Sequence, residues 1–149
     1  PDIMTLAKAL GNGLPIGAML ATSDAATGFD YGSHATTFGG TPLATAAALE
    51  VLNLISQPEF LEMVNETGVY FKNRLLALKE KHSRVQAVRG KGLLLGMELD
   101  KDAPYFVTRL LKKGFIINGI QDKVLRFAPP LIIDKKEIDR LISALDSLL

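Results

Sequence analysis

The sequence contains no cysteine, no tryptophan and only two histidines. The absence of cysteine excludes disulfide bonds, thiolate metal ligands and a cysteine nucleophile, and it suits a reducing compartment such as the cytoplasm. Two histidines, His34 and His82, are too few for a histidine-based metal centre, so we expect no metal. No apolar run approaches the ~20 residues that cross a bilayer, and no signal-peptide pattern is present, so we expect no membrane association.

Positive charge is almost missing from the first half of the chain. Lys8 is the only lysine or arginine among residues 1–71, which carry seven acidic side chains. The other basic residues are interleaved with acids and the net charge is +1, so no basic face for nucleic acid is expected. Lys8 is bracketed by Leu6-Ala7 and Ala9-Leu10, which predicts that its ammonium group is desolvated. A desolvated amine is a candidate nucleophile.

The remaining composition predicts a globular chain whose character changes along its length. With 149 residues, 48% of them hydrophobic, it can form one ordinary core with a leading segment attached. Residues 1–41 hold seven of the 13 glycines and are expected to be mostly loop, with a short buried strand within Pro15–Thr22. Thr41 followed by Pro42 predicts the start of a helix that runs to about Ser56.

After residue 56 the pattern predicts an α+β arrangement of a small antiparallel sheet with helices on one face. The expected helices begin at the capping pattern Ser56–Glu59, at Asp102 with Pro104 in its first turn, and at Asp134. The expected strands are residues 84–89 and 93–99, joined by a Gly90-Lys91-Gly92 turn, followed by residues 115–117 and 124–127.

Four segments in this order resemble one known family. They are PDIMTLAKALGNGLPIGAML, GSHATTFGGTPLATAAALEVL, VRGKGLLLGMEL and LRFAPPLII, and together they span nearly the whole chain. They resemble the C-terminal portion of class III pyridoxal-phosphate-dependent aminotransferases, most like acetylornithine or ornithine aminotransferase. The resemblance implies the α/β architecture of fold-type I enzymes. Residues 1–57 would end the large cofactor domain, including its connecting helix, and residues 58–149 would form the small α+β domain.

The resemblance also implies roles for four residues. Lys8 matches the lysine that holds pyridoxal 5'-phosphate as a Schiff base and then moves a proton between substrate and cofactor. Thr37 matches a threonine that binds the cofactor phosphate from the neighbouring subunit, with Thr36 beside it, which implies a homodimer. Arg126 matches the arginine that binds the α-carboxylate of the substrate. It precedes the stiff segment Ala128-Pro129-Pro130, and a guanidinium on a rigid backbone can donate two parallel hydrogen bonds to a carboxylate.

Other polar residues receive structural interpretations. Thr41 is expected to cap its helix, and His34 is expected to be a hydrogen-bonded loop residue. Arg89 is interpreted as a structural residue of the hairpin, and Glu98 and Asp100 as solvated turn residues without metal-pair spacing.

The function expected from the resemblance is transfer of an amino group between N-acetylornithine, or a similar ω-amine donor, and 2-oxoglutarate. The family also needs an aspartate for the pyridine nitrogen, a phosphate loop and a stacking aromatic residue upstream of Lys8, so this chain by itself is expected to be inactive. The alternative is a non-catalytic α+β binding or oligomerisation module. Within the family, 4-aminobutyrate aminotransferase or an aminomutase is the nearest competitor.

Overall fold

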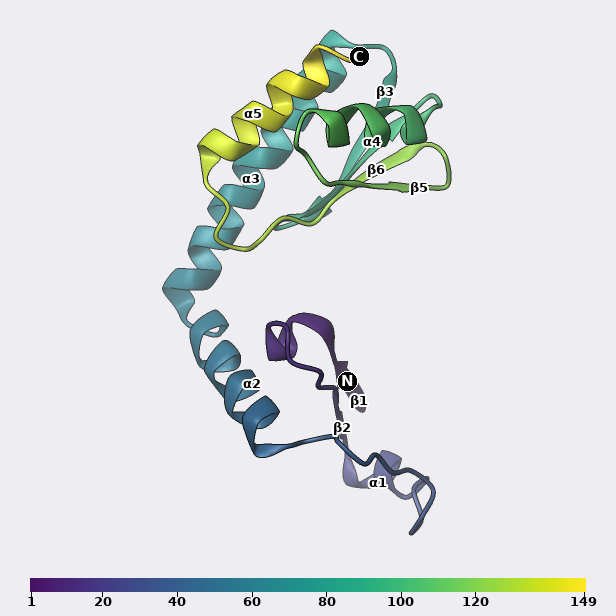
Figure 1. Ribbon diagram of the computed structural model, residues 1–149, viewed down its shortest axis with the longest axis vertical. Helices are drawn as coiled ribbons and strands as arrows, with labels where there is room; N and C mark the ends of the chain where they lie inside the picture. Colours follow the sequence, from purple (N-terminus) through teal and green to yellow (C-terminus); the bar gives the residue numbers. More distant parts are fainter. The chain divides into compact units, whose positions relative to one another are not determined.

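The computed structural model describes residues 1–149 and contains two compact units (Figure 1). The N-terminal unit comprises Pro1–Phe60 and the C-terminal unit comprises Leu61–Leu149. Each unit has its own secondary structure and is described by itself.

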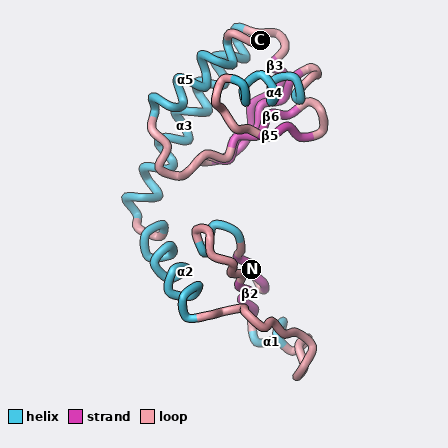
Figure 2. Tube along the Cα trace, viewed as in Figure 1, coloured by secondary structure: helices cyan, strands magenta, loops and turns pink.

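The N-terminal unit is a small hairpin, a long loop and a helix. Its elements are β1 (Ile3–Leu6), the 3-10 turn η1 (Lys8–Gly11), β2 (Ala18–Ala21), α1 (Ser23–Ala26) and α2 (Pro42–Ile55). The two strands pair antiparallel, and Figure 2 shows loop between α1 and α2, as expected from the glycine content. The core of this unit is minimal: Leu10 of η1 and the alanines Ala44 and Ala48 of α2 are buried, and η1 contacts α2.

The expectation of a buried strand within Pro15–Thr22 is wrong in its burial. A strand is present at Ala18–Ala21, but Met19 and Leu20 are 47% and 50% exposed. The physical reason is that β2 pairs only with β1, and a two-stranded hairpin cannot cover its own faces. Its apolar side chains therefore stay at the surface of this chain.

The C-terminal unit is a four-stranded antiparallel sheet with three helices. The elements in chain order are α3 (Pro58–Lys81), which begins just before the unit boundary, β3 (Val85–Lys91), β4 (Leu94–Leu99), α4 (Ala103–Lys112), β5 (Asn118–Ile120), β6 (Val124–Phe127) and α5 (Lys135–Asp146). The strand order is β3-β4-β6-β5, and every neighbouring pair is antiparallel. The expected hairpin of β3 and β4 is confirmed.

The strand expected at residues 115–117 lies later, at Asn118–Ile120. The backbone N–H of Phe115 donates to the carbonyl of Leu110 at 2.9 Å, closing the end of α4 after the left-handed Gly114. The N–H of residue 115 is therefore used at the C-terminal end of α4 and is not available for hydrogen bonding within the sheet. The sheet pairing begins only at Asn118, which lies opposite Arg126.

The core of the C-terminal unit lies between one face of the sheet and the helices. Along β4, Leu95, Met97 and Leu99 are buried, while Gly96 and Glu98 between them point to the opposite face. The buried side chains of the helices complete a single cluster and include Phe71, Leu75, Phe106, Leu110, Ile138 and Leu145. The expected α/β class, with a small antiparallel sheet and helices on one face, is confirmed.

Two expected helix caps have different outcomes. At α5, Asp134 caps as expected, because its Oδ1 accepts a hydrogen bond from the N–H of Glu137 at 2.8 Å. At α4, Asp102 occupies the N-cap position but makes no capping hydrogen bond, and its backbone is left-handed with φ 65°. A capping residue normally has an extended backbone, so the left-handed conformation explains why the cap is not formed. The Oδ2 of Asp102 lies 3.5 Å from Nη2 of Arg84.

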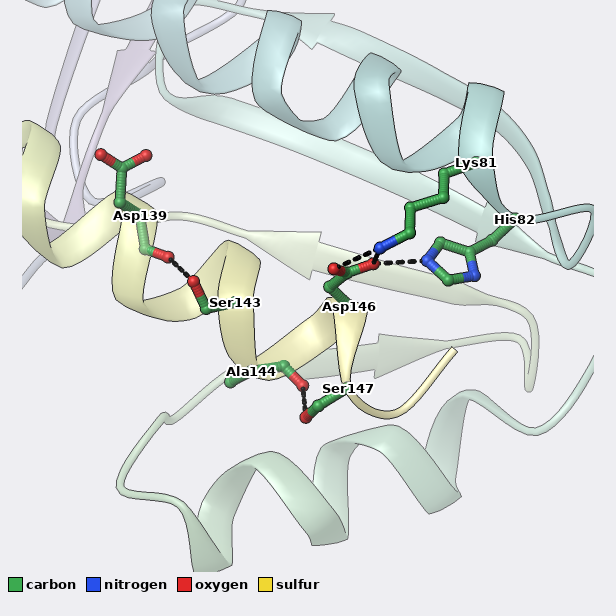
Figure 3. A network of polar contacts seen from close by, with 7 residues as sticks. All are labelled: Lys81, His82, Asp139, Ser143, Ala144, Asp146 and Ser147. Carbon is green, nitrogen blue, oxygen red and sulfur yellow. Dashed lines mark hydrogen bonds and ion pairs between the residues drawn. The ribbon is translucent and has the colours of Figure 1, made fainter.

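The ends of α3 and α5 are joined by an ion-pair cluster. Figure 3 shows Lys81 and His82 pointing at Asp146, with Lys81 Nζ 2.6 Å from Oδ2 and His82 Nε2 2.6 Å from Oδ1. The hydrogen bond from Lys81, followed by that from His82, lowers the pKa of the Asp146 carboxyl below its ordinary value. This cluster fixes the last turn of α5 against the last turn of α3.

Glycine permits an unusually close approach of α3 to the β3–β4 turn. A Cβ placed on Gly68 would lie 2.5 Å from the carbonyl carbon and oxygen of Gly92 and 2.7 Å from its Cα. Gly92 itself has φ 55°, so the turn also depends on a residue that tolerates the left-handed region. The helix can rest on this turn only while position 68 has no side chain.

Candidate functional site

Lys8 lies in a strained turn immediately after β1. It opens the 3-10 turn η1 and has φ 54°, in the left-handed region that costs an ordinary residue of the order of 1–2 kcal/mol. Asn12, at the end of the same turn, has φ 46°. Such strain persists only where the surrounding structure imposes it, and it concentrates at functional sites.

The expected desolvation of Lys8 is not found in this chain. Leu10 is 8% exposed and packs in the unit's small core, but Lys8, Ala7 and Ala9 are exposed. The reason is that η1 turns one apolar side chain toward α2 and leaves Lys8 on the open side. Lys8 takes part in no ion pair or side-chain hydrogen bond, so its amine is accessible for reaction.

The two candidate phosphate-binding threonines lie in the loop before α2. Thr36 is used within that loop, because its Oγ1 accepts a hydrogen bond from the N–H of Gly39 at 3.1 Å. Thr37 is exposed, and no hydrogen bond of its side chain is formed within the chain. His34 is also exposed.

Thr41 stands at the N-cap position of α2, as expected, but its side chain makes no capping hydrogen bond. Its carbonyl oxygen accepts bonds from the N–H and Oγ1 of Thr45 instead. Pro42 at the first helical position has no N–H group and therefore leaves one fewer donor without a partner at this helix start.

The lysine and the threonines are not brought together within one chain. Lys8 lies at the end of the hairpin where β1 leads into η1, whereas the loop with Thr36 and Thr37 follows α1 at the other end (Figure 1). No hydrogen bond joins Lys8 to either threonine.

Arg126 lies in the C-terminal unit, on the face of the sheet away from the helices. Its neighbours along β6, Leu125 and Phe127, are 0% and 2% exposed, so the alternation of the strand places Arg126 on the open face. It pairs in register with Gly96 on β4 and Asn118 on β5. Arg126 forms none of the ion pairs in the structure, so its guanidinium can receive a carboxylate.

The sheet joins Glu98 and Arg89, which the sequence alone does not link. Glu98 is a half-buried residue of β4, not a solvated turn residue, and its Oε2 forms an ion pair with Nη2 of Arg89 on β3. Sequence reasoning missed this pair because it depends on the strand register. Asp100, by contrast, is exposed after the strand and accepts a hydrogen bond from Nε of Arg84 at 3.3 Å.

The chain contains no grouping of three or more His, Asp or Glu side chains that could hold a metal ion. None of its helices combines the length and apolar character that a membrane span requires. The groups with evident chemical capacity are therefore an accessible amine on a strained turn, exposed hydroxyls in a glycine-rich loop and an unpaired guanidinium on an open sheet face.

Comparison with known proteins gives concordant matches. The sequence profile of the family described as aminotransferase class-III matches residues 1–149. The acetylornithine aminotransferase of Caldanaerobacter subterraneus subsp. tengcongensis is 51% identical over 150 residues, covering 100% of this chain and 38% of that protein. The acetylornithine aminotransferase of Methanocaldococcus jannaschii is 49% identical over 146 residues, covering 98% of this chain and 37% of that protein.

Solved structures give the same result for the fold. The ornithine δ-aminotransferase of Plasmodium falciparum superposes with a TM-score of 0.88 at 31% identity, over 99% of this chain and 38% of that one. The acetylornithine aminotransferase of Elizabethkingia anophelis gives a TM-score of 0.86 at 29% identity, over 99% of this chain and 40% of that one. The chain thus spans about two fifths of the length of the relatives it matches. Its sequence and its fold show that the chain belongs to the class-III aminotransferase family.

Proposed function

We propose that the full-length protein containing this chain is an aminotransferase that moves an amino group between N-acetylornithine and 2-oxoglutarate in arginine and ornithine metabolism. The observation that carries this proposal is the identity of 51% and 49% to two acetylornithine aminotransferases across essentially the whole chain. Both of these relatives are named for the acetylated donor, which supports N-acetylornithine as the amino donor.

The residues present fit a pyridoxal 5'-phosphate cofactor. An aldehyde requires an accessible amine, which Lys8 offers, and a phosphate requires donors such as the hydroxyls of Thr37 and Thr36. When bound, this cofactor supplies an electron sink for breaking bonds at the amino-bearing carbon. Lys8 Nζ would anchor the cofactor and then hold and transfer the proton removed from the substrate.

Arg126 would bind the α-carboxylate of glutamate or 2-oxoglutarate. Its position on a strand between two buried neighbours limits its movement, and its guanidinium has no internal carboxylate partner. Two parallel hydrogen bonds from such a fork orient a carboxylate as well as attracting it. This orientation fixes which substrate carbon is presented for proton transfer.

The remaining parts of the site are proposed to come from outside this chain. Residues 1–57 would end the large cofactor domain and residues 58–149 would form the small domain, so the aspartate, phosphate loop and stacking aromatic would lie upstream. The loop with Thr37 would reach the cofactor of a neighbouring subunit in a homodimer, which agrees with its place at the other end of the hairpin from Lys8. We place the enzyme in the cytoplasm, in keeping with the absence of cysteine from this chain.

The proposal is tested in the full-length protein. Incubation with pyridoxal 5'-phosphate, borohydride reduction and peptide mass spectrometry should give one adduct on Lys8, and Lys8→Ala should abolish it. Single-turnover spectra should show both the N-acetylornithine and the glutamate half-reactions. Arg126→Ala should retain the adduct but lower kcat/KM of the glutamate half-reaction by about 10² to 10³, the effect of losing a charged bidentate contact. A full-length protein without an adduct and without either half-reaction would instead support a non-catalytic module.

A further inference from the structure

The open face of the sheet in the C-terminal unit carries two arginines separated by a glycine. Gly96 on β4 pairs in register with Arg89 on one side and with Arg126 on the other. A Cβ at position 96 would meet only Val124 Cγ1 at 3.5 Å and Arg89 Cγ at 4.0 Å, so the space above β4 holds no side chain of its own. The two arginines therefore flank one open position of the sheet, on the same face.

Glu98 lies in the same relation to both arginines. It is two residues from Gly96, on the same face, and pairs with Ala87 of β3 and Val124 of β6. Ala87 is two residues from Arg89 and Val124 is two residues from Arg126, so Glu98 is a diagonal neighbour of each arginine. Diagonal pairs across adjacent strands are about 7–8 Å apart at the backbone, within reach of long side chains.

The carboxylate of Glu98 is paired with Arg89, and Arg126 is left without a carboxylate. Glu98 is the only acidic residue within the four strands, so it is the sheet's one internal competitor for either arginine. It is half-buried, whereas both arginines are exposed, so the acid is the less mobile partner.

We propose that Arg89 is a positioning residue that holds Glu98 and so keeps Arg126 available for the substrate carboxylate. This inference rests on the proposed function, in which Arg126 binds that carboxylate. Without Arg89, the carboxylate of Glu98 turns to Arg126 and competes with glutamate or 2-oxoglutarate for the same guanidinium. Arg89 itself touches neither substrate nor cofactor in this arrangement.

The test uses full-length holoenzyme and two readouts. The first is the dissociation constant of glutarate, an unreactive dicarboxylate, and the second is the KM for 2-oxoglutarate. Arg89→Ala should raise both constants by about two- to sixfold. This range corresponds to the free energy of an exposed ion pair, here between Glu98 and Arg126, that the substrate would have to displace. The N-acetylornithine half-reaction should be unchanged, because a donor that presents its distal amine is expected to place its α-carboxylate away from Arg126.

Rescue separates positioning from a structural role. The double variant Arg89→Ala/Glu98→Gln removes the competitor and should restore glutarate binding to within about twofold of wild type. Arg89→Lys keeps a cation diagonal to Glu98 and should bind glutarate as wild type does. A double variant as weak as Arg89→Ala, with Glu98→Gln alone unaffected, would assign Arg89 to sheet stability and overturn the proposal.

The single variant Glu98→Gln separates pairing from net charge. Because Glu98 is already held by Arg89, its neutralisation should leave glutarate binding unchanged. A gain in affinity as large as the loss in Arg89→Ala would mean that only the net charge of the face matters, and it would also overturn the proposal.

Failure of the proposed function gives a different result. If Arg126 is not the carboxylate site, Arg126→Ala binds glutarate as wild type does, and the role of Arg89 fails with it. If Arg126→Ala loses glutarate binding while Arg89→Ala does not, the proposed function stands and only the role of Arg89 is overturned.

Discussion

Replacement of Gly68 by alanine tests the close approach of α3 to the β3–β4 turn. Intrinsic helix propensity alone favours alanine over glycine by about 1 kcal/mol in a helix interior. The new methyl group, however, would lie 2.5 Å from backbone atoms of Gly92, where carbon atoms ordinarily keep about 3.5 Å. The contact is with backbone, so no side-chain rotation relieves it, and the helix or the turn must move by about 1 Å.

Overpacking of this kind costs about 1–3 kcal/mol, occasionally more, so we expect Gly68→Ala to destabilise the C-terminal unit by up to about 2 kcal/mol after the gain in propensity. For a unit of this size, that lowers the midpoint of thermal unfolding by up to about 8–16 °C, measurable by circular dichroism at 222 nm. The matched control is Ala77→Gly at an exposed position of the same helix, expected to cost about 1 kcal/mol. Propensity alone gives these two changes opposite signs, so a Gly68→Ala protein more stable than wild type would refute the packing argument.

Two further predictions concern Lys8 and Asp146. Lys8→Gly and Lys8→Ala both remove the amine, but only glycine accepts φ 54° without strain, so apo full-length Lys8→Gly should be more stable than Lys8→Ala by about 1 kcal/mol in urea unfolding. Equal stability would mean that the turn is not strained. Because Lys81 and His82 lower the folded-state pKa of Asp146, its pairing should stabilise the protein above about pH 4 and cease to do so as pH falls through that lowered pKa. Asp146→Asn should therefore be less stable than wild type at pH 6 and approach it in acid, and a difference independent of pH would exclude the ion pair as its cause.

The sequence predicted most accurately the features that depend on local chemistry. The helix starts at Pro42 and Pro58 and the cap at Asp134 follow from the residues at those positions alone, and the β3–β4 hairpin follows from the glycine-containing turn between two apolar runs.

Features that depend on distant partners were not predictable. Asp102 does not cap α4 because its backbone is left-handed in the folded chain, and Glu98 pairs with Arg89 because the hairpin register makes them diagonal neighbours. The exposure of Lys8 could not be deduced from its apolar neighbours in sequence, because burial depends on which elements pack over η1. Lys8 was a candidate from its isolation among apolar residues, whereas Thr36, Thr37 and Arg126 came from the family resemblance, and the roles of all four stay predictions.

The β1–β2 hairpin affects how the chain should be handled as a purified sample. Each strand has a partner on one side only, and Ile3, Met4, Met19 and Leu20 are all at least 45% exposed. Unpaired strand edges beside apolar side chains are the arrangement that promotes sheet-to-sheet aggregation between molecules. A fragment for crystallisation or NMR would begin at Ser56, because that boundary removes the unpaired edges of both β1 and β2 and keeps all of α3, which begins at Pro58.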